Sequence, residues 1–232
     1  LDNPKPISAA DMWAVLASSG STAALVIGIF GVMAITSEYT TSAVQSSLTV
    51  NPRRGMFYAT KSVAAALFAL VAGIAGILLA AGVLWLFTRG HDITALTSDQ
   101  SRIIPVTLIG FPLTIVLVSL MAQGLGGMTR STVGGVCALI VLFMVLSSVL
   151  SVTSMAINQV EWLGTLSYLT PDTAMNHFLG AGIESSSQSH LAAAVKPNYW
   201  IPDWWQSGLI LLAWAAAAWA GGLIVTKKAD IK

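Results

Sequence analysis

Long uninterrupted apolar runs dominate the pattern of positions along the chain. Five stretches are long enough for a helix that crosses the roughly 30 Å apolar core of a bilayer, and none contains Asp, Glu, Lys, Arg or His. They cover about residues 12–36, 62–87, 103–127, 133–157 and 207–226. The stretch 62–87 is apolar on every side, whereas a helix of a soluble core has a polar face. The pattern predicts an all-α fold, a polytopic bundle of membrane-spanning helices that forms one transmembrane domain over residues 1–232.

Composition supports a membrane protein and excludes several other classes. Only 9% of the 232 residues are charged and 55% are hydrophobic, whereas a soluble domain carries roughly 25% charged residues. Disorder needs low hydrophobicity and high charge. The single cysteine, Cys137, excludes a disulfide scaffold. Eleven Lys and Arg against ten Asp and Glu argue against nucleic acid as a partner, so the expected surroundings are a lipid bilayer.

The polar linkers alternate in charge. Segments 37–61 and 128–132 and the tail from Lys227 together carry seven basic and two acidic residues, whereas the segments on the other side carry four basic and eight acidic. Basic residues near span ends favour the cytoplasmic side, which predicts a cytoplasmic C-terminus. Five spans then place Leu1 outside without a recognisable signal peptide, so we expect a preceding span that would make six, with both ends cytoplasmic.

Tryptophan placement is consistent with this orientation, because amphipathic rings prefer the membrane–water interface. Six of the eight tryptophans fall near the predicted outer boundary: Trp13, Trp85, Trp162, Trp200, Trp204 and Trp205. The other two, Trp214 and Trp219, lie within the last stretch. We expect them to face lipid or a partner helix.

The predicted spans lack the residues of several membrane activities. Ion-coupled transporters usually place carboxylates or histidines at membrane depth, and His91, His177 and His190 all fall in predicted outer linkers. We expect these histidines to be solvated, which leaves no Ser–His pair at membrane depth. No G-x-x-x-x-G-K-[ST] motif occurs, so any nucleotide would be bound by another chain. We therefore expect no catalytic site, cofactor or metal on this chain.

The first cytoplasmic segment, residues 37–61, has an organisation of its own and is called the elbow below. Ser37 and Glu38 are typical of a helix start, and Asn51–Pro52 of a helix end. Arg53 and Arg54 can then meet phosphate headgroups or an acidic partner, and Lys61 can snorkel at the next span. Four residues give one apolar face: Tyr39, Ala43, Val44 and Leu48. On these residues alone, a docking helix and a passive connector remain equally open.

The elbow resembles that of type-2 ATP-binding-cassette (ABC) transporter permeases, and most closely their actinobacterial branch. The similarity lies in the Glu38–Tyr39 pair, a short helix that ends in Leu-x-x-x-Pro-x-Arg, and Lys61 at the head of the next span. The family commonly has Gly-Thr after the glutamate, where this chain has Thr41–Ala43. In that family this segment couples the membrane subunit to its ATPase. The resemblance implies that Glu38, Tyr39, Arg53, Arg54 and Lys61 are the coupling residues.

The resemblance extends over the rest of the chain. The family has six spans, a helical external stretch similar to Tyr168–Leu179, and a last span that ends in basic residues like Lys227 and Lys228. It implies a permease subunit of an ATP-driven exporter in a bacterial plasma membrane. Its partners would be a second permease, identical or homologous, and cytoplasmic ABC ATPase subunits that bind ATP and Mg. The alternative is a scaffold or sensor subunit that docks a cytoplasmic partner without transport.

The outer linker 158–206 is too long for a simple connection. Its apolar spacing predicts two short interfacial helices, Glu161–Leu169 and Pro171–Leu179, anchored by Trp162, Leu163, Leu166, Tyr168, Met175 and Phe178. The aromatic cluster in Tyr199–Trp205 is open to two interpretations, a lid over an exit path or an interfacial belt. Pro105 and Pro112 should bend the third span. The many span glycines indicate helix packing, with a dimer interface or a path as the alternative.

Overall fold

Five helical spans make up the computed structural model, which describes residues 7–40, 54–98, 100–156, 161–183 and 199–228. All five are long and apolar enough to cross a membrane, which confirms the all-α, multi-pass fold. The first combines α1 (Ala9–Ser18) and α2 (Gly20–Thr40). The second is α4 (Arg54–Thr88), the third α5 (Ile103–Thr129) and the last α11 (Trp204–Lys228). The fourth combines α6 (Thr132–Ile140), the π-helix η1 (Val141–Val145) and α7 (Leu146–Ala156).

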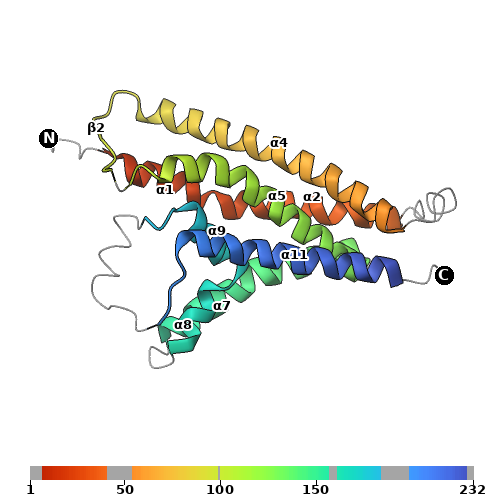
Figure 1. Ribbon diagram of the computed structural model, residues 1–232. Helices are drawn as coiled ribbons and strands as arrows, with labels where there is room; N and C mark the ends of the chain where they lie inside the picture. The colour runs from red at the N-terminus through yellow and green to blue at the C-terminus, as the bar shows by residue number, and fades with distance from the viewer. Residues whose placement is uncertain (1–6, 41–53, 99, 157–160, 184–198, 229–232) are drawn as a thin grey trace.

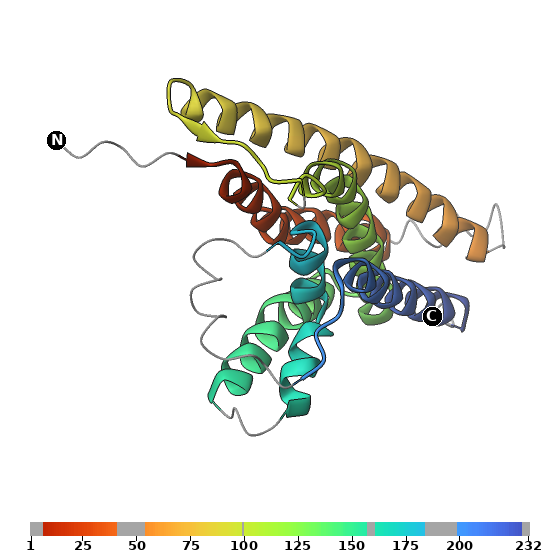
Figure 2. The same ribbon diagram turned by 60° about the vertical axis from the view of Figure 1, so that its left-hand side comes forward.

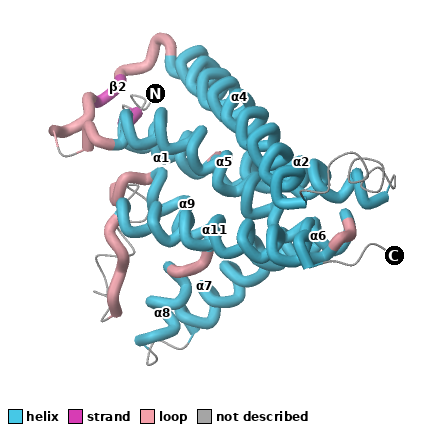
Figure 3. Tube along the Cα trace, turned by 45° about the vertical axis from the view of Figure 1, so that its right-hand side comes forward, coloured by secondary structure: helices cyan, strands magenta, loops and turns pink. Residues whose placement is uncertain are grey.

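The bundle has two distinct ends (Figure 1). At one end α2 and α11 finish and α4 begins. We call this the elbow end, because residues 41–53 connect α2 to α4 there. At the opposite loop end, the segment after α4 carries β2 (Ile93–Thr94), which pairs in parallel with β1 (Ile7–Ser8). Figure 3 shows the longer described loops, around β2 and after α9, at the loop end.

Helix α5 is the centre of the bundle. It packs against α2, α4, α6, α9 and α11. One cluster of buried apolar side chains draws on α1, α2, α4, α5, α6, η1, α9 and α11, with Phe111, Ile115, Val118 and Met121 of α5 in its middle. Pro112 lies inside α5, as expected. Pro105 lies in its first turn, where backbone N–H groups have no intrahelical partner, so Pro105 removes no hydrogen bond, contrary to the sequence prediction.

The boundaries of the elbow differ from the prediction. Helix α2 continues to Thr40, so no separate helix begins at Ser37. Helix α4 begins at Arg54, eight residues before the predicted span start at Ser62. The early start has a packing reason, because Tyr58 lies in these added turns and is fully buried. The predicted helix between 41 and 50 and its stop at Asn51–Pro52 lie outside the described residues.

The outer linker contains the two predicted helices, but one of them is not interfacial. Helix α8 (Glu161–Tyr168) and helix α9 (Pro171–Leu179) match the expected ranges closely. Figure 2 shows α7 and α8 extending away from α4, whereas α9 returns to the bundle. There α9 contacts α2, α5 and α11, and Met175, predicted to be an interfacial anchor, is fully buried in the core. Trp162 of α8 is exposed, as an interfacial residue would be.

Candidate functional site

The predicted coupling residues divide between two helices that meet the elbow. Glu38 and Tyr39 lie on the last turn of α2, and Arg54 and Lys61 lie on the first turns of α4. Arg53 and the side chains of Glu38, Tyr39 and Arg54 lie outside the described part of the chain. Lys61 is half-buried. The structure therefore places four of the five positions at the elbow end of α2 and α4, without describing the cluster that their side chains would form.

At the elbow end, α4 is held to α11 by an aromatic network. The Trp219 indole N–H donates to the Ser62 hydroxyl at 2.8 Å, and the Tyr58 hydroxyl donates to the Trp219 carbonyl at 3.4 Å. The two rings also contact each other, with centroids 5.7 Å apart. A buried indole or phenol needs such a partner. The Trp219 indole N–H therefore faces α4 of the same chain rather than lipid. The Trp214 indole N–H likewise has a partner within the chain, because it donates to the Leu169 carbonyl at 2.8 Å.

Helix α2 is held to α5 and α6 near the same end. The Thr132 hydroxyl, at the start of α6, donates to the Thr36 hydroxyl at 2.8 Å. A Cβ added at Gly31 would lie 2.5 Å from the Ser119 carbonyl oxygen, so the backbones of α2 and α5 are in close contact there. Small residues permit such approach between membrane helices. Both helices that continue into the elbow are thus firmly packed at the elbow end.

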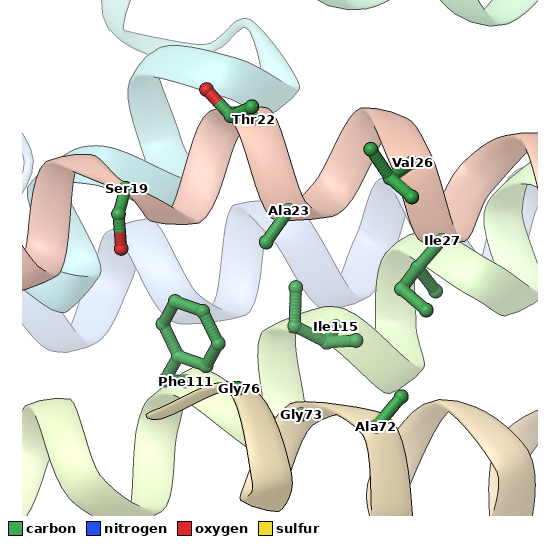
Figure 4. Close-up of a pocket in the computed structure, with 10 residues that line it drawn as sticks. All are labelled: Ser19, Thr22, Ala23, Val26, Ile27, Ala72, Gly73, Gly76, Phe111 and Ile115. Atoms are coloured by element: carbon green, nitrogen blue, oxygen red, sulfur yellow. The ribbon is translucent and has the colours of Figure 1, made fainter. Parts of the chain in front are cut away.

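Further toward the loop end, α2 and α4 separate and leave a groove of about 390 Å³. Figure 4 shows its two walls, α2 and α4, with Phe111 and Ile115 of α5 between them. The lining residues are uncharged: Ser19, Thr22, Ala23, Val26, Ile27, Ala72, Gly73, Gly76, Phe111 and Ile115. At Gly73 a Cβ would lie 2.9 Å from the Cα of Pro112, but at Gly76 it would meet only Phe111, at 3.9 Å. Gly73 therefore lets α4 approach α5, and Gly76 keeps the groove open.

An aromatic pair lies one helical turn from the groove on its elbow side. Phe30 of α2 and Phe68 of α4 have ring centroids 5.9 Å apart. Both rings are about half exposed, at 51% and 56%. Because α2 and α4 run in opposite directions, both phenylalanines lie beyond the same end of the groove. The pair thus bridges α2 and α4 just beyond the elbow-side end of the groove.

Gln123 is a buried polar residue in the half of α5 nearer the elbow end, and the sequence analysis did not single it out. It lies on α5 and is fully buried. Among the described residues, neither its amide nitrogen nor its amide oxygen has a hydrogen-bond partner. Each unsatisfied buried group costs about 1–3 kcal/mol. The signal available in the sequence was a single amide side chain in span three, whose other polar residues are only threonines and a serine.

At the loop end, polar contacts attach α9 to α2 and α11. The Ser21 hydroxyl donates to the Asp172 carboxylate at 2.7 Å, and the Asn176 amide donates to the Ser21 hydroxyl at 2.8 Å. Burial raises the pKa of Asp172 above its ordinary value, although the hydrogen bonds from Ser21 and Asn176 lower it. His177, expected to be solvated, lies on α9 with its Nδ1 3.0 Å from the Ser207 hydroxyl. Ser207 is fully buried, so this contact fastens α9 to α11.

Neither a protein-family model nor a curated protein sequence matches the chain. The functional interpretation therefore depends on the residues and on the geometry. That geometry consists of an elbow between two anchored helices and a groove between the same two helices. Sequence reasoning identified the elbow but missed the groove, because a groove depends on which helices become neighbours. Within the part of the chain that the structure describes, no group of three or more His, Cys, Asp or Glu side chains could hold a metal ion.

Proposed function

We propose that the chain is the membrane-spanning permease subunit of an ATP-driven ABC exporter, coupled to separate ATPase subunits through the elbow. One observation carries the proposal: the elbow joins α2 and α4, and the groove lies between these same two helices. Glu38 and Tyr39 on α2 and Arg54 and Lys61 on α4 are the residues that the resemblance implies for coupling, and they flank the connection between the two helices. Arg53 completes the set between them in sequence.

In this proposal the ATPase subunits move the elbow when they bind ATP and come together. The elbow moves α2 and α4 as levers, because each helix is packed against its neighbours close to the point of attachment. Thr36 links α2 to α6, and Trp219 links α4 to α11. A displacement at the elbow is then transmitted to the bundle instead of being absorbed by loose helix ends. A second permease, identical or homologous, would complete the translocation path.

Gln123 supports a bundle with more than one packing arrangement. Its fully buried, unpartnered amide is unfavourable in the state described here. A rearrangement that separates α5 from its neighbours would give this amide water or a polar group of the cargo as a partner. Free-energy differences of a few kcal/mol between two packings are typical of switching proteins. An apolar bundle with one such amide suits an amphipathic or lipid-like cargo better than an ion.

The test compares two double variants of the full chain, purified from membranes that contain its native partners. Glu38→Ala with Arg53→Ala alters the elbow. Arg89→Ala with Asp92→Ala is the matched control, because it removes one basic and one acidic residue from the segment that directly follows the other end of α4. We expect the elbow variant to lose co-purifying ATPase activity at least tenfold and the control to retain it. Equal ATPase recovery from the elbow variant and the unaltered chain would refute the coupling role.

A further inference from the structure

We propose that the groove between α2 and α4 is a binding site for one acyl chain of a bilayer phospholipid. The proposal does not depend on the proposed transport function, because it follows from where the groove lies and what lines it. The occupant is the distal part of a single hydrocarbon chain, with its methyl end directed toward Phe30 and Phe68.

The depth of the groove places it within the apolar core of the membrane. Its wall on the first span runs from Ser19, directly before α2, to Ile27, near the middle of the span Ala9–Ser37. At 1.5 Å per residue this wall is about 12 Å long. The distal halves of lipid chains occupy this depth, because the polar headgroups lie outside the roughly 30 Å apolar core. At this depth the groove is therefore surrounded by the hydrocarbon chains of lipids and not by water.

The chemistry of the lining selects a hydrocarbon over a polar or charged ligand. Eight of the ten lining residues are glycine or carry purely apolar side chains, and none is charged. The two hydroxyl residues, Ser19 and Thr22, lie toward the loop end, and the Ser19 hydroxyl already donates to the Leu16 carbonyl at 2.7 Å. No cationic group is present in the lining to bind a phosphate. A headgroup therefore has no partner here, whereas a chain has apolar walls on three sides.

The size and shape of the groove fit one chain. Its volume of about 390 Å³ lies near the lower end of the roughly 300–1,000 Å³ range of ligand pockets. The Phe30–Phe68 pair bridges α2 and α4 one helical turn beyond its elbow-side end. A second helix would need a channel that continues along α2 and α4 in both directions, and the aromatic pair interrupts such a channel. The end of a single hydrocarbon chain needs only a short groove that is open to lipid on one side.

The groove is also continuous with the lipid-facing surface of the molecule. Val26 on its rim is half exposed, and the neighbouring Ile29 and Val71 are exposed as well. A chain in the annular lipid layer can therefore enter sideways without crossing a polar barrier. An unfilled groove would leave its lining atoms without van der Waals partners, whereas a chain restores these contacts at several methylenes simultaneously.

The experiment uses the full chain in phosphatidylcholine vesicles that contain a small fraction of a photoreactive phosphatidylcholine. This probe carries a diazirine at the terminal carbon of one acyl chain. After illumination, the adducts are mapped to peptides. We expect adducts concentrated on the segments around Phe30 and Phe68, and few when the diazirine is placed on the headgroup instead.

Two variants fill the groove from opposite walls. Gly76→Leu places a side chain where a Cβ meets only Phe111, and Val26→Trp fills the groove from α2. Gly82→Leu is the matched control, because Gly82 lies on the same helix with no atom within 4 Å of its added Cβ. We expect both filling variants to lower the adducts around Phe30 and Phe68 at least threefold, and the control to leave them unchanged. Adducts spread evenly along α4 would overturn the proposal. Equal losses of adducts in Gly76→Leu and Gly82→Leu would also overturn it, as would adducts that link two copies of the protein across the groove.

Discussion

At Asp172, burial and hydrogen bonding have opposite effects on the pKa of the carboxyl group. Desolvation is the larger effect and raises the pKa above the ordinary 3.8. The folded protein therefore binds this proton more tightly than the unfolded chain does. Below the ordinary pKa both states are protonated, and the carboxyl group imposes no cost on folding. As the pH rises from the ordinary pKa through the folded pKa, ionisation of the buried group progressively lowers stability.

Asp172→Asn should remove this dependence. The asparagine keeps an oxygen that can accept the hydrogen bond from Ser21, but it carries no charge to desolvate. We expect the unfolding midpoint of the variant to rise relative to that of the unaltered protein as the pH increases from 4 to 7. Thermal unfolding of both proteins in detergent measures this difference, and other titrating groups cancel in the comparison. A difference that stays constant with pH, or that moves the other way, would contradict this explanation.

Other single residues show what a sequence pattern does and does not determine. The apolar run around Trp219 predicts a membrane helix correctly, but it does not say that the indole N–H meets Ser62 of a helix far away in sequence. In the same way, His177 falls in a polar linker by sequence and still lies against buried Ser207. Both cases depend on tertiary neighbours, which periodicity within one element does not specify.

At the scale of elements, α5 and α11 approach each other closely at two glycines. A Cβ at Gly124 would clash with the Ala218 carbonyl, and a Cβ at Gly222 would lie 2.7 Å from the Gly124 carbonyl oxygen. Neither clash involves a flexible side chain, so both helices would have to move apart. The sequence interpretation of span glycines as packing residues is confirmed at these positions. Gly76, which lines the groove, and Gly82 make no such close helix contact.

Gly124→Ala should therefore destabilise the bundle despite the better helix propensity of alanine. Forcing extra volume into a packed interface costs about 1–3 kcal/mol. Gly82→Ala on α4 is the control and should be neutral or slightly stabilising, because nothing lies within 4 Å of the added Cβ. Equilibrium unfolding of both variants in mixed micelles measures the two free energies. Equal stability of the two variants would show that the α5–α11 contact is looser than described.

The outer linker shows how helix prediction and helix placement differ. The spacing of apolar residues predicts α8 and α9 almost to the residue. Both helices were expected at the interface, but Met175, one of the predicted anchors, is fully buried, and α9 packs against α2, α5 and α11. An apolar face requires burial without specifying whether lipid or protein supplies it. For α9, the hydrogen bonds of Asp172, Asn176 and His177 to α2 and α11 favour packing against the protein over a position at the membrane interface.

For the whole molecule, the number of spans was predictable because a bilayer leaves few options. Backbone groups in lipid must be satisfied within helices, so apolar length alone indicates how many segments cross. The central position of α5 and the divergence of α2 from α4 were not predictable, because every span presents similar apolar surfaces. The groove arises from that divergence. The elbow, by contrast, was recognisable from its polar residues, although its ends belong to α2 and α4.

The most direct test of the account is whether a nucleotide-hydrolysing protein contacts the elbow in its native membrane. A photoreactive benzoylphenylalanine is introduced at Val50, in the elbow, and separately at Leu96, in the loop between α4 and α5. After illumination of intact cells, the account predicts that Val50 captures a cytoplasmic ATP-hydrolysing chain and that Leu96 does not. Adducts at Val50 without any nucleotide-binding protein, or the same partners at both positions, would contradict it.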